Sequence, residues 1–512
     1  MRRPTGTTVV VGAALVLAGA ATPAVAATPG TAAAVARPAS PIQWQPCEGH
    51  PALDCATVPM PIDWSAPAGP ATPIAIIRGK AAKPEQRKGV LLVDPGGPGG
   101  SGVDFATDIV EDHALSPSLT DAFDVIGFDP RGVSRSAALT CDDVVLNDWV
   151  DFYPETGPVY RGLIDHNDRL GRSCRQYSGP LADHADTTSV VRDVDALRQA
   201  LGEDKISYYG RSYGTQIGEQ YAELFGSHLR ALALDSVMDH SVDTMGFLAP
   251  QNLAFEDSFT DFTAWCGRTA ACSLHDRDGL ALWDGLYAKA AAGKLNYPGS
   301  SYPISVSQLR DTVLFYLYDP ARWAVMADWL KSIADGNPGT TLARSTEPGT
   351  RSELPIWCGD WKWDEVDSLA ALTSYRELSE TVAPHTRLSP LYTQLTECLG
   401  WGGRVSNPQH RLHVTQAPPI LMTNSVHDVA TPYQWARSVA AQLPTSTLLT
   451  YDGTGHGDYR LSSCARAAID TYLITLRTPA PGTHCPAEWP TTGSAGTPRA
   501  TAQPGSPPAR RG

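Results

Sequence analysis

Three residues of the kinds used in nucleophilic catalysis occur along the chain in the order Ser212, Asp428 and His456. A serine hydroxyl is a weak nucleophile until a histidine removes its proton and a carboxylate holds that histidine in the correct orientation. This combination predicts acyl transfer through a catalytic triad. Asp235 and Asp239 are alternative acids, and we favour Asp428.

Ser212 lies in a G-x-S-x-G match at residues 210–214. The run 206–209 before it is rich in β-branched and aromatic residues and predicts a short buried strand. A helical pattern follows, with apolar residues at spacings of three and four (Ile217, Tyr221 and Leu224). Strand, turn and helix in this order form a nucleophile elbow, where flanking glycines leave room for the strained turn and the helix N-terminus favours a developing oxyanion. A plain strand-to-helix turn is the alternative interpretation.

Asp428 and His456 each follow a late strand-like run, at residues 419–424 and 446–451, and a glycine flanks the histidine on either side. The carboxyl ends of parallel strands meet at one edge of a sheet, so we expect both side chains to reach the serine turn. The order of serine, acid and histidine is that of the α/β-hydrolases. His427 is expected to point away and to be structural.

A second glycine-rich segment, residues 94–102 (DPGGPGGSG), follows the buried-strand pattern of residues 89–93. Glycine lets backbone N–H groups approach a ligand closely. A dinucleotide-binding loop needs G-x-G-x-x-G at the start of a helix, and the two prolines here fit that pattern poorly. An oxyanion loop after an early strand fits better, and a simple tight turn is the alternative.

Strand patterns alternate with helical ones over the first half of the chain and again near its end. Residues 123–129 and 230–235 predict further strands, and Thr187 or Thr188 is expected to cap a helix before the elbow. This alternation predicts an α/β protein whose mostly parallel sheet is covered by helices on both faces. Between residues 241 and 411 the pattern predicts an inserted helical lid, with helices at 253–265, 280–291, 307–318, 321–334 and 366–382.

The start of the chain indicates an exported protein, and the overall charge disfavours some classes of partner. The 512 residues carry a formal charge of −14, which disfavours nucleic acid and anionic membranes as partners. Residues 1–26 have the charged start, apolar run and A-x-A end of a signal peptide, and the apolar run is too short to span a membrane. Residues 27–40 are a leader or short propeptide, and residues 489–512 predict a disordered tail. We therefore expect a secreted, extracellular protein.

The ten cysteines occur as five neighbouring couples. In an exported chain they are expected to form disulfides, and short loops close most readily. No C-x-x-C or H-E-x-x-H spacing occurs, which disfavours a zinc site. The predicted pairs are Cys47–Cys55, Cys141–Cys174, Cys266–Cys272, Cys358–Cys398 and Cys464–Cys485.

Several of these motifs together resemble the secreted tripeptidyl aminopeptidases of actinobacteria, which are α/β-hydrolase serine exopeptidases related to prolyl aminopeptidases. The motifs are residues 94–102, 128–132 and 210–214, the Asp428 segment and residues 455–457. The resemblance implies an α/β-hydrolase core at residues 41–240 and 412–488, with the lid at 241–411 between them. It also implies a triad of Ser212, Asp428 and His456, and an oxyanion hole made by the backbone N–H groups of Gly97 and Tyr213.

The same resemblance implies hydrolysis of peptide bonds near a free N-terminus, with release of tripeptides or of single residues. The resemblance also implies that carboxylates of the lid bind the free α-amine of the substrate. Such carboxylates are needed because a buried ammonium requires a paired anion. Glu256 and Asp360 are our candidates, since each lies beside an aromatic residue. The mechanism requires no metal and no organic cofactor. A secreted carboxylesterase or lipase, a prolyl-type aminopeptidase and an inactive binding module are the alternatives, and the oligomeric state stays open.

Overall fold

The computed structural model describes residues 41–297, 299–336 and 352–490. The chain divides into two units, residues 1–35 and 36–512, and every described residue belongs to the second. The expected signal peptide at 1–26, the leader at 27–40 and residues 491–512 of the expected tail lie outside the described residues.

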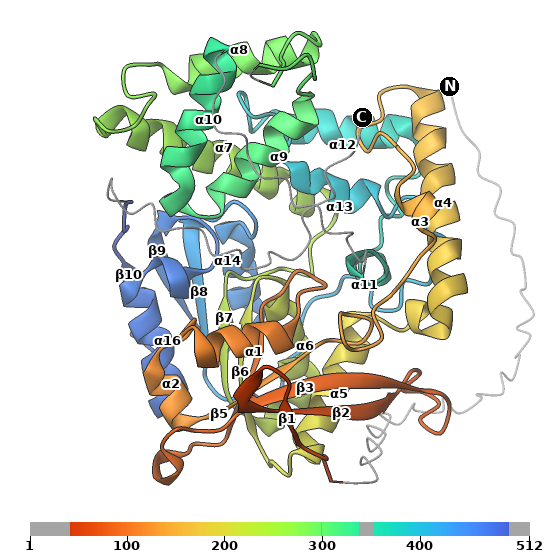
Figure 1. Cartoon of the computed structure of the whole chain (residues 1–512), viewed down its shortest axis with the longest axis vertical. Coiled ribbons are helices and arrows are strands. Elements are labelled where there is room, and N and C mark those ends of the chain that lie inside the picture. The colour runs from red at the N-terminus through yellow and green to blue at the C-terminus, as the bar shows by residue number, and fades with distance from the viewer. Residues whose placement is uncertain (1–40, 298, 337–351, 491–512) are drawn as a thin grey trace, which may run out of the picture. The chain divides into compact units, whose positions relative to one another are not determined.

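Among the described residues, ten strands form one sheet at the centre of the fold (Figure 1). The strands are β1 (Gln45–Cys47), β2 (His50–Pro61), β3 (Ala71–Gly79), β4 (Val90–Asp94), β5 (Asp124–Phe128), β6 (Ile206–Arg211), β7 (Leu229–Asp235), β8 (Ile420–His427), β9 (Ser446–Thr454) and β10 (His484–Cys485). Their order in space is β1-β2-β3-β5-β4-β6-β7-β8-β9-β10. The pairs from β1 to β3 and the β3–β5 pair are antiparallel, and all other neighbours are parallel.

Helices cover both faces of this sheet. α1 (Gly102–Glu111), α2 (Pro117–Ala122) and α16 (Ser463–Thr475) share one buried cluster with alternate residues of the strands. α5 (Thr187–Ala200), α6 (Tyr213–Phe225) and α14 (Tyr433–Gln442) lie on the opposite face (Figure 1). Burial on both faces explains why β4 reads as a continuous apolar run, since all its residues are buried. The predicted class is confirmed: the molecule has the α/β-hydrolase fold.

The described residues between β7 and β8 add helices and no strand to the sheet. These helices are α7 (Thr244–Arg268), α8 (Gly279–Ala291), α9 (Val306–Leu317), α10 (Trp323–Asp335), α11 (Glu353–Asp360), α12 (Leu369–Glu380) and α13 (Thr393–Thr396). The five helices expected here are present, while α11 and α13 were not predicted. Buried tryptophans form much of the core of this insert: Trp265, Trp283, Trp323, Trp329, Trp357, Trp361 and Trp363. We call this segment the lid.

A second insertion, between β5 and β6, packs against the lid. It contains α3 (Asp143–Leu146) and the long helix α4 (Gly157–Ser178). Asn167 of α4 donates to the carbonyls of Thr396 and Leu399, both at 2.8 Å. This segment lies within residues 41–240, which we expect to belong to the core, and these two hydrogen bonds connect it to the lid.

All ten cysteines form disulfides, and the five predicted pairs are confirmed. Cys358–Cys398 connects α11 to the segment after α13. Five disulfides indicate folding in an oxidising, extracytoplasmic compartment. In the part of the chain that the structure describes, no helix has the length and apolar character needed to cross a membrane.

Candidate active site

Ser212 lies at the turn between β6 and α6, in a conformation that few non-glycine residues adopt. Its φ of 59° with ψ of −130° is a strained combination. The flanking glycines permit it: a Cβ on Gly210 would lie 2.3 Å from the carbonyl oxygen of Gly214, and one on Gly214 would lie 2.7 Å from an oxygen of Asp94. The turn therefore has the strand-turn-helix geometry of a nucleophile elbow.

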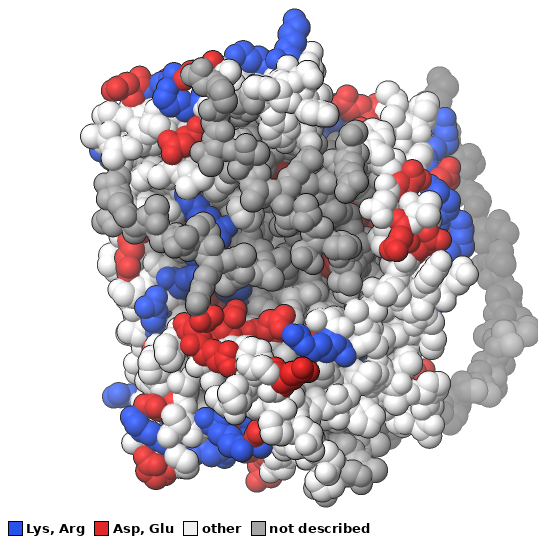
Figure 2. All heavy atoms as spheres, viewed as in Figure 1, with Lys and Arg blue, Asp and Glu red and all other residues white. Residues whose placement is uncertain are grey.

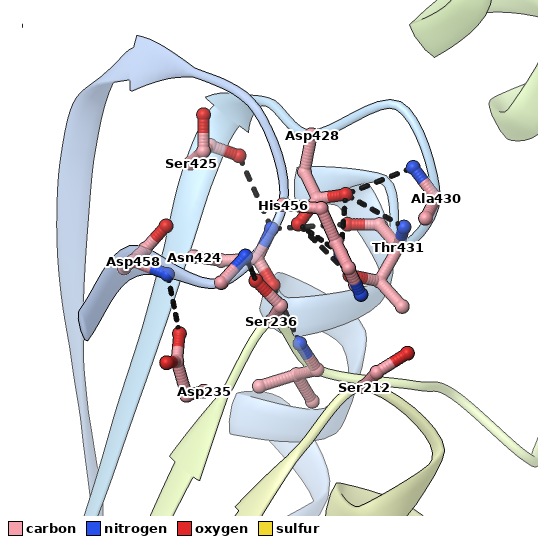
Figure 3. Close-up of polar contacts among 12 residues, drawn as sticks. Ser212, Asp235, Ser236, Asn424, Ser425, Asp428, Ala430, Thr431, His456 and Asp458 are labelled. Atoms are coloured by element: carbon pink, nitrogen blue, oxygen red, sulfur yellow. Dashed lines mark hydrogen bonds and ion pairs between the residues drawn. The ribbon is translucent and has the colours of Figure 1, made fainter. Parts of the chain in front are cut away.

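His456 and Asp428 form hydrogen bonds with each other at the carboxyl edge of the sheet (Figure 3). The Nδ1 atom of His456 lies 3.0 Å from each oxygen of Asp428, whose side chain is fully buried. A carboxylate only accepts hydrogen bonds, so Nδ1 carries the proton and Nε2 is left as an acceptor. This is the tautomer that a general base requires.

Further donors hold the carboxylate of Asp428. The backbone N–H groups of Ala430 and Thr431 both donate to it at 2.9 Å. The hydroxyl of Thr431 donates to Oδ2 at 3.0 Å and lies 3.4 Å from Nδ1 of His456. The turn after β8 thus holds the carboxylate on one side, and the imidazole binds it on the other.

The end of β7 links the serine turn to the loop that carries His456. The carbonyl of Asp235 accepts from the N–H of Ser212 at 2.9 Å, while its carboxylate accepts from the N–H of Asp458 at 2.7 Å. Ser236 accepts from the N–H of Gly457 at 2.8 Å (Figure 3). No hydrogen bond among the described residues joins the hydroxyl of Ser212 to the imidazole, and such bonds often tighten only when substrate binds.

Neither alternative acid contacts the histidine. The carboxylate of Asp235 accepts from Tyr209, Asp458, Tyr459 and Thr423. That of Asp239 accepts from the backbone and hydroxyl of Ser241 at 2.8 and 2.6 Å. The geometry therefore favours Asp428 as the partner of His456.

A buried carboxyl group lies behind this pair. Asp458 has no exposed surface, and burial, followed by the charges of Asp235 and Asp428, raises its pKa well above the ordinary range. The neutral acid is the favoured form, because three ionised carboxylates so close together in a buried region would repel one another.

The glycine-rich loop after β4 lies against the serine turn. A Cβ on Gly96 would lie 2.4 Å from the carbonyl oxygen of Arg211 and 2.9 Å from the N atom of Tyr213. The N–H of Gly96 donates to Asp94 at 2.8 Å, and burial raises the pKa of Asp94 to about 7. The N–H groups of Gly97 and Tyr213 donate no hydrogen bond to any described residue. Two backbone donors without a partner among the described residues, close to a nucleophile, are what an oxyanion hole needs.

The lid reaches the histidine through Tyr318, just after α9. The ring of Tyr318 packs edge-to-face on the imidazole, with centroids 5.2 Å apart, and its carbonyl accepts from the N–H of His456 at 3.0 Å. His427 points elsewhere, as expected. Its Nδ1 lies 2.5 Å from Asp257 of α7, and its Nε2 lies 3.5 Å from Asp261.

The two candidate clamp residues are occupied by contacts within the protein. The carboxylate of Glu256 accepts from the N–H and hydroxyl of Thr386 at 2.7 and 2.8 Å, and more weakly from the N–H of His385. Asp360 has no exposed surface and is held by side chains of α5 and α6. A substrate amine would have to displace these donors, so the geometry fits neither residue as the amine clamp.

Sequence reasoning missed three residues of the site: Thr431, Ser236 and Tyr318. Only Thr431 left a signal, because Asp followed three positions later by Thr is typical of a turn in which the carboxylate accepts from the backbone. Ser236 and Tyr318 reach the histidine loop from other elements, so no local pattern marks them.

The sheet order, the elbow and the histidine–carboxylate pair define a serine hydrolase of the α/β-hydrolase class. Comparison with known proteins agrees with this class: residues 388–485, which include Asp428 and His456, match the family described as TAP-like protein. Tripeptidyl aminopeptidase from Streptomyces lividans is 30% identical over 88% of this chain and 88% of its own length. Serine protease Hip1 from Mycobacterium tuberculosis is 30% identical over 87% and 91%, respectively. Carboxylesterase B from the same organism is 32% identical over 84% and 86%.

Relatives this similar over most of their length establish the family. The chain belongs to the TAP-like family of α/β-hydrolases.

Proposed function

We propose that this chain is a secreted serine exopeptidase that hydrolyses peptide bonds near a free N-terminus and releases tripeptides. The observation that supports the proposal is the arrangement at the sheet edge, where Asp235 joins the strained turn of Ser212 to the loop of an imidazole that a buried carboxylate orients. The names of the relatives support peptides as the substrate class.

In the proposed mechanism, the hydroxyl of Ser212 attacks the scissile carbonyl and Nε2 of His456 takes its proton. Asp428 stabilises the resulting imidazolium without taking the proton itself. The N–H groups of Gly97 and Tyr213 donate to the oxyanion, a contribution of about 3 to 4 kcal/mol per donor in comparable sites. His456 then protonates the leaving amine, and water hydrolyses the acyl-enzyme in the reverse sequence of steps.

A secreted carboxylesterase is the second candidate function. One observation favours it: Carboxylesterase B, at 32% identity, is as similar to this chain as the peptidases are. Esters and peptides pass through the same acyl-enzyme, so the triad by itself does not separate the two functions.

A matched set of substrates separates them. We would measure kcat/KM for a chromogenic tripeptide amide with a free N-terminus, its N-acetylated form, the corresponding single-residue amide and a short-chain acyl ester. The proposal predicts that the free tripeptide amide is preferred and that acetylation lowers kcat/KM at least about 100-fold, because it removes the substrate ammonium and leaves the anion that pairs with it unpaired. Equal turnover of the two tripeptides, or efficient turnover of the ester alone, would exclude the exopeptidase. Preference for the single-residue amide would indicate a prolyl-type aminopeptidase.

A further inference from the structure

Asp360, the last residue of lid helix α11, lies buried beneath the serine turn, where polar side chains of the core converge on it. Its carboxylate accepts from five groups: the N–H of Thr187 at 2.9 Å, the hydroxyl of Thr187 at 2.5 Å, Nδ2 of Asn407 at 2.9 Å, Nε2 of Gln216 at 3.3 Å and, at the longest distance of 3.4 Å, the phenol of Tyr213. Thr187 begins α5 and Gln216 lies in α6, so one lid carboxylate joins the first turns of both core helices.

The hydroxyl of Thr187 extends this contact to the residue that follows the nucleophile. The phenol oxygen of Tyr213 lies 2.5 Å from Oγ1 of Thr187 and 3.4 Å from Oδ2 of Asp360. Burial raises the pKa of Asp360 to about 7, and above that pH the ionised carboxylate is an acceptor only, so the hydroxyl of Thr187 donates to Asp360 and the phenol of Tyr213 donates to Thr187. The direction of the chain of hydrogen bonds is therefore set by Asp360.

The elbow needs such an anchor. The conformation of Ser212 is strained, and strain persists only where the surroundings hold it. On one side, the N–H of Ser212 donates to Asp235 at 2.9 Å. On the other side, the phenol of Tyr213 ties the first residue of α6 to the start of α5, and Tyr213 is only 3% exposed.

The first residue of α11 lies next to the glycine-rich loop, which supplies the other proposed donor of the oxyanion hole. A Cβ on Gly99 of the glycine-rich loop would lie 3.4 Å from the backbone N of Glu353, the first residue of α11. The helix thus begins at the loop that carries Gly97 and ends at the hydrogen bonds that hold Tyr213. Cys358–Cys398 ties the same helix to the rest of the lid.

We propose that Asp360 is a positioning residue of the oxyanion hole, which holds Tyr213 through Thr187 and so aims the Tyr213 N–H at the oxyanion. The lid thereby completes the hole from inside the molecule, without contact between Asp360 and substrate. This inference rests on the proposed function, because it takes Ser212 as the nucleophile and Tyr213 as a donor.

The first test removes only the phenol oxygen. Tyr213→Phe keeps the ring and the backbone N–H but breaks the hydrogen bond to Thr187. We expect kcat to fall about 10- to 100-fold, as a small misplacement of a catalytic group does, while KM changes little. A peptide boronic acid, whose adduct with the serine places an oxygen in the hole, should lose affinity by the same factor. A substrate-like inhibitor that forms no adduct should bind as before.

The second test combines this variant with Asp360→Asn, assayed at a pH of about 8, where the wild-type carboxylate is ionised. Asp360→Asn alone should lower kcat to a similar degree. In the Tyr213→Phe background it should lower kcat no further, because both changes break one chain of contacts. If the two substitutions acted independently, the fold-losses in kcat of the single variants would multiply in the double variant.

Asp186→Asn is the matched control. Asp186 is 4% exposed and caps α5 one residue before Thr187, where it accepts from the N–H of Ser189 at 3.0 Å. It makes no hydrogen bond to Tyr213 in the described residues, so its kcat and boronate affinity should stay within about twofold of the wild type.

Unchanged kcat and boronate affinity in Tyr213→Phe, or multiplicative effects in the double variant, would overturn this inference. The proposed function would survive that result if Ser212→Ala were inactive. An active, folded Ser212→Ala protein would overturn the proposed function instead. If Asp360→Asn fails to fold, the kcat and boronate measurements on Tyr213→Phe still decide.

Discussion

The base half of the candidate site, Asp428 and His456, is built almost wholly by strand ends of the core, whereas the oxyanion half depends on the lid. In the base half, β7 and the turn after β8 supply the side chains that hold the pair, and the lid adds one ring and one carbonyl from Tyr318. In the oxyanion half, the lid supplies the buried carboxylate of Asp360. The oxyanion half therefore depends on the position of α11, while the base half depends mainly on strand ends of the core.

The largest effect should come from the residue that both halves serve. Ser212→Ala removes the nucleophile and should lower kcat roughly 10⁴- to 10⁶-fold while the protein stays folded, as single triad deletions do. Hydrolysis of a peptide amide and labelling by a fluorophosphonate probe measure this. Substantial turnover by the folded variant, or labelling of another serine, would refute the role of both halves.

The acid tests the base half alone. Asp428→Asn should lower kcat about 10⁴-fold, because an amide favours the wrong imidazole tautomer. Asp239→Asn is the control, since Asp239 bonds Ser241 and not His456, and it should keep kcat within a few-fold of the wild type. If the control lost activity and Asp428→Asn did not, the assignment of the acid would move.

Thr431 should have a smaller effect within the same half. Thr431→Val removes the hydroxyl that donates to Oδ2 of Asp428 while keeping the side-chain shape. A hydrogen bond to a charged group is worth about 1.5 to 3 kcal/mol, so we expect kcat to fall roughly 10- to 100-fold. Thr431→Ser should restore most of the rate, because it returns the hydroxyl. Equal loss in the serine variant would mean that the methyl group, not the hydroxyl, matters.

The smallest effect concerns the contact between lid and core beside the base half. Burial opposes the charge of His427, but the hydrogen bond to Asp257 and the charges of Asp257 and Asp261 outweigh it and raise the His427 pKa above its usual range. A raised pKa in the folded state means stabilisation that is complete below a pH of about 6 and is lost as pH rises through the raised pKa.

His427→Gln should therefore lower Tm at acidic pH, and its Tm should approach that of the wild type as pH rises. Thermal melts across that range measure the difference. A constant difference in Tm at all pH values would show that the ion pair with Asp257 adds nothing beyond shape. The side chains are partly exposed, at 27% for His427 and 44% for Asp257, so salt should reduce the effect.

The class of fold and the base half were open to prediction from the sequence because their signals are local. Apolar runs followed by chemistry-bearing residues place Ser212, Asp428 and His456 after strands, and parallel strands bring their carboxyl ends to one edge. Cysteines that are neighbours in sequence close short loops, and the structure joins each cysteine to the neighbour that was predicted.

The lid shows where local signals end. Helical periodicity identified five of its helices, but periodicity reports which face is apolar and not what that face meets. Thr187 is instructive: its position at a helix start suggested a cap, yet Asp186 caps α5, and the Thr187 hydroxyl bonds Asp360 and Tyr213. A short polar side chain at a helix start satisfies either role, and only packing selects between them.

The sequence by itself determined the fold class and the order of the proposed triad, since both follow from the order of motifs along the chain. Spacing favoured the five disulfide pairs, and the structure established them. Only the tertiary structure decided the roles of Glu256 and Asp360. Each carboxylate lies beside aromatic residues in sequence, but a carboxylate binds whichever donors the fold brings to it. For Asp360 those donors come from residues 187, 216 and 407, far from it in the chain, and their convergence turns an expected substrate contact into an internal support of the serine turn.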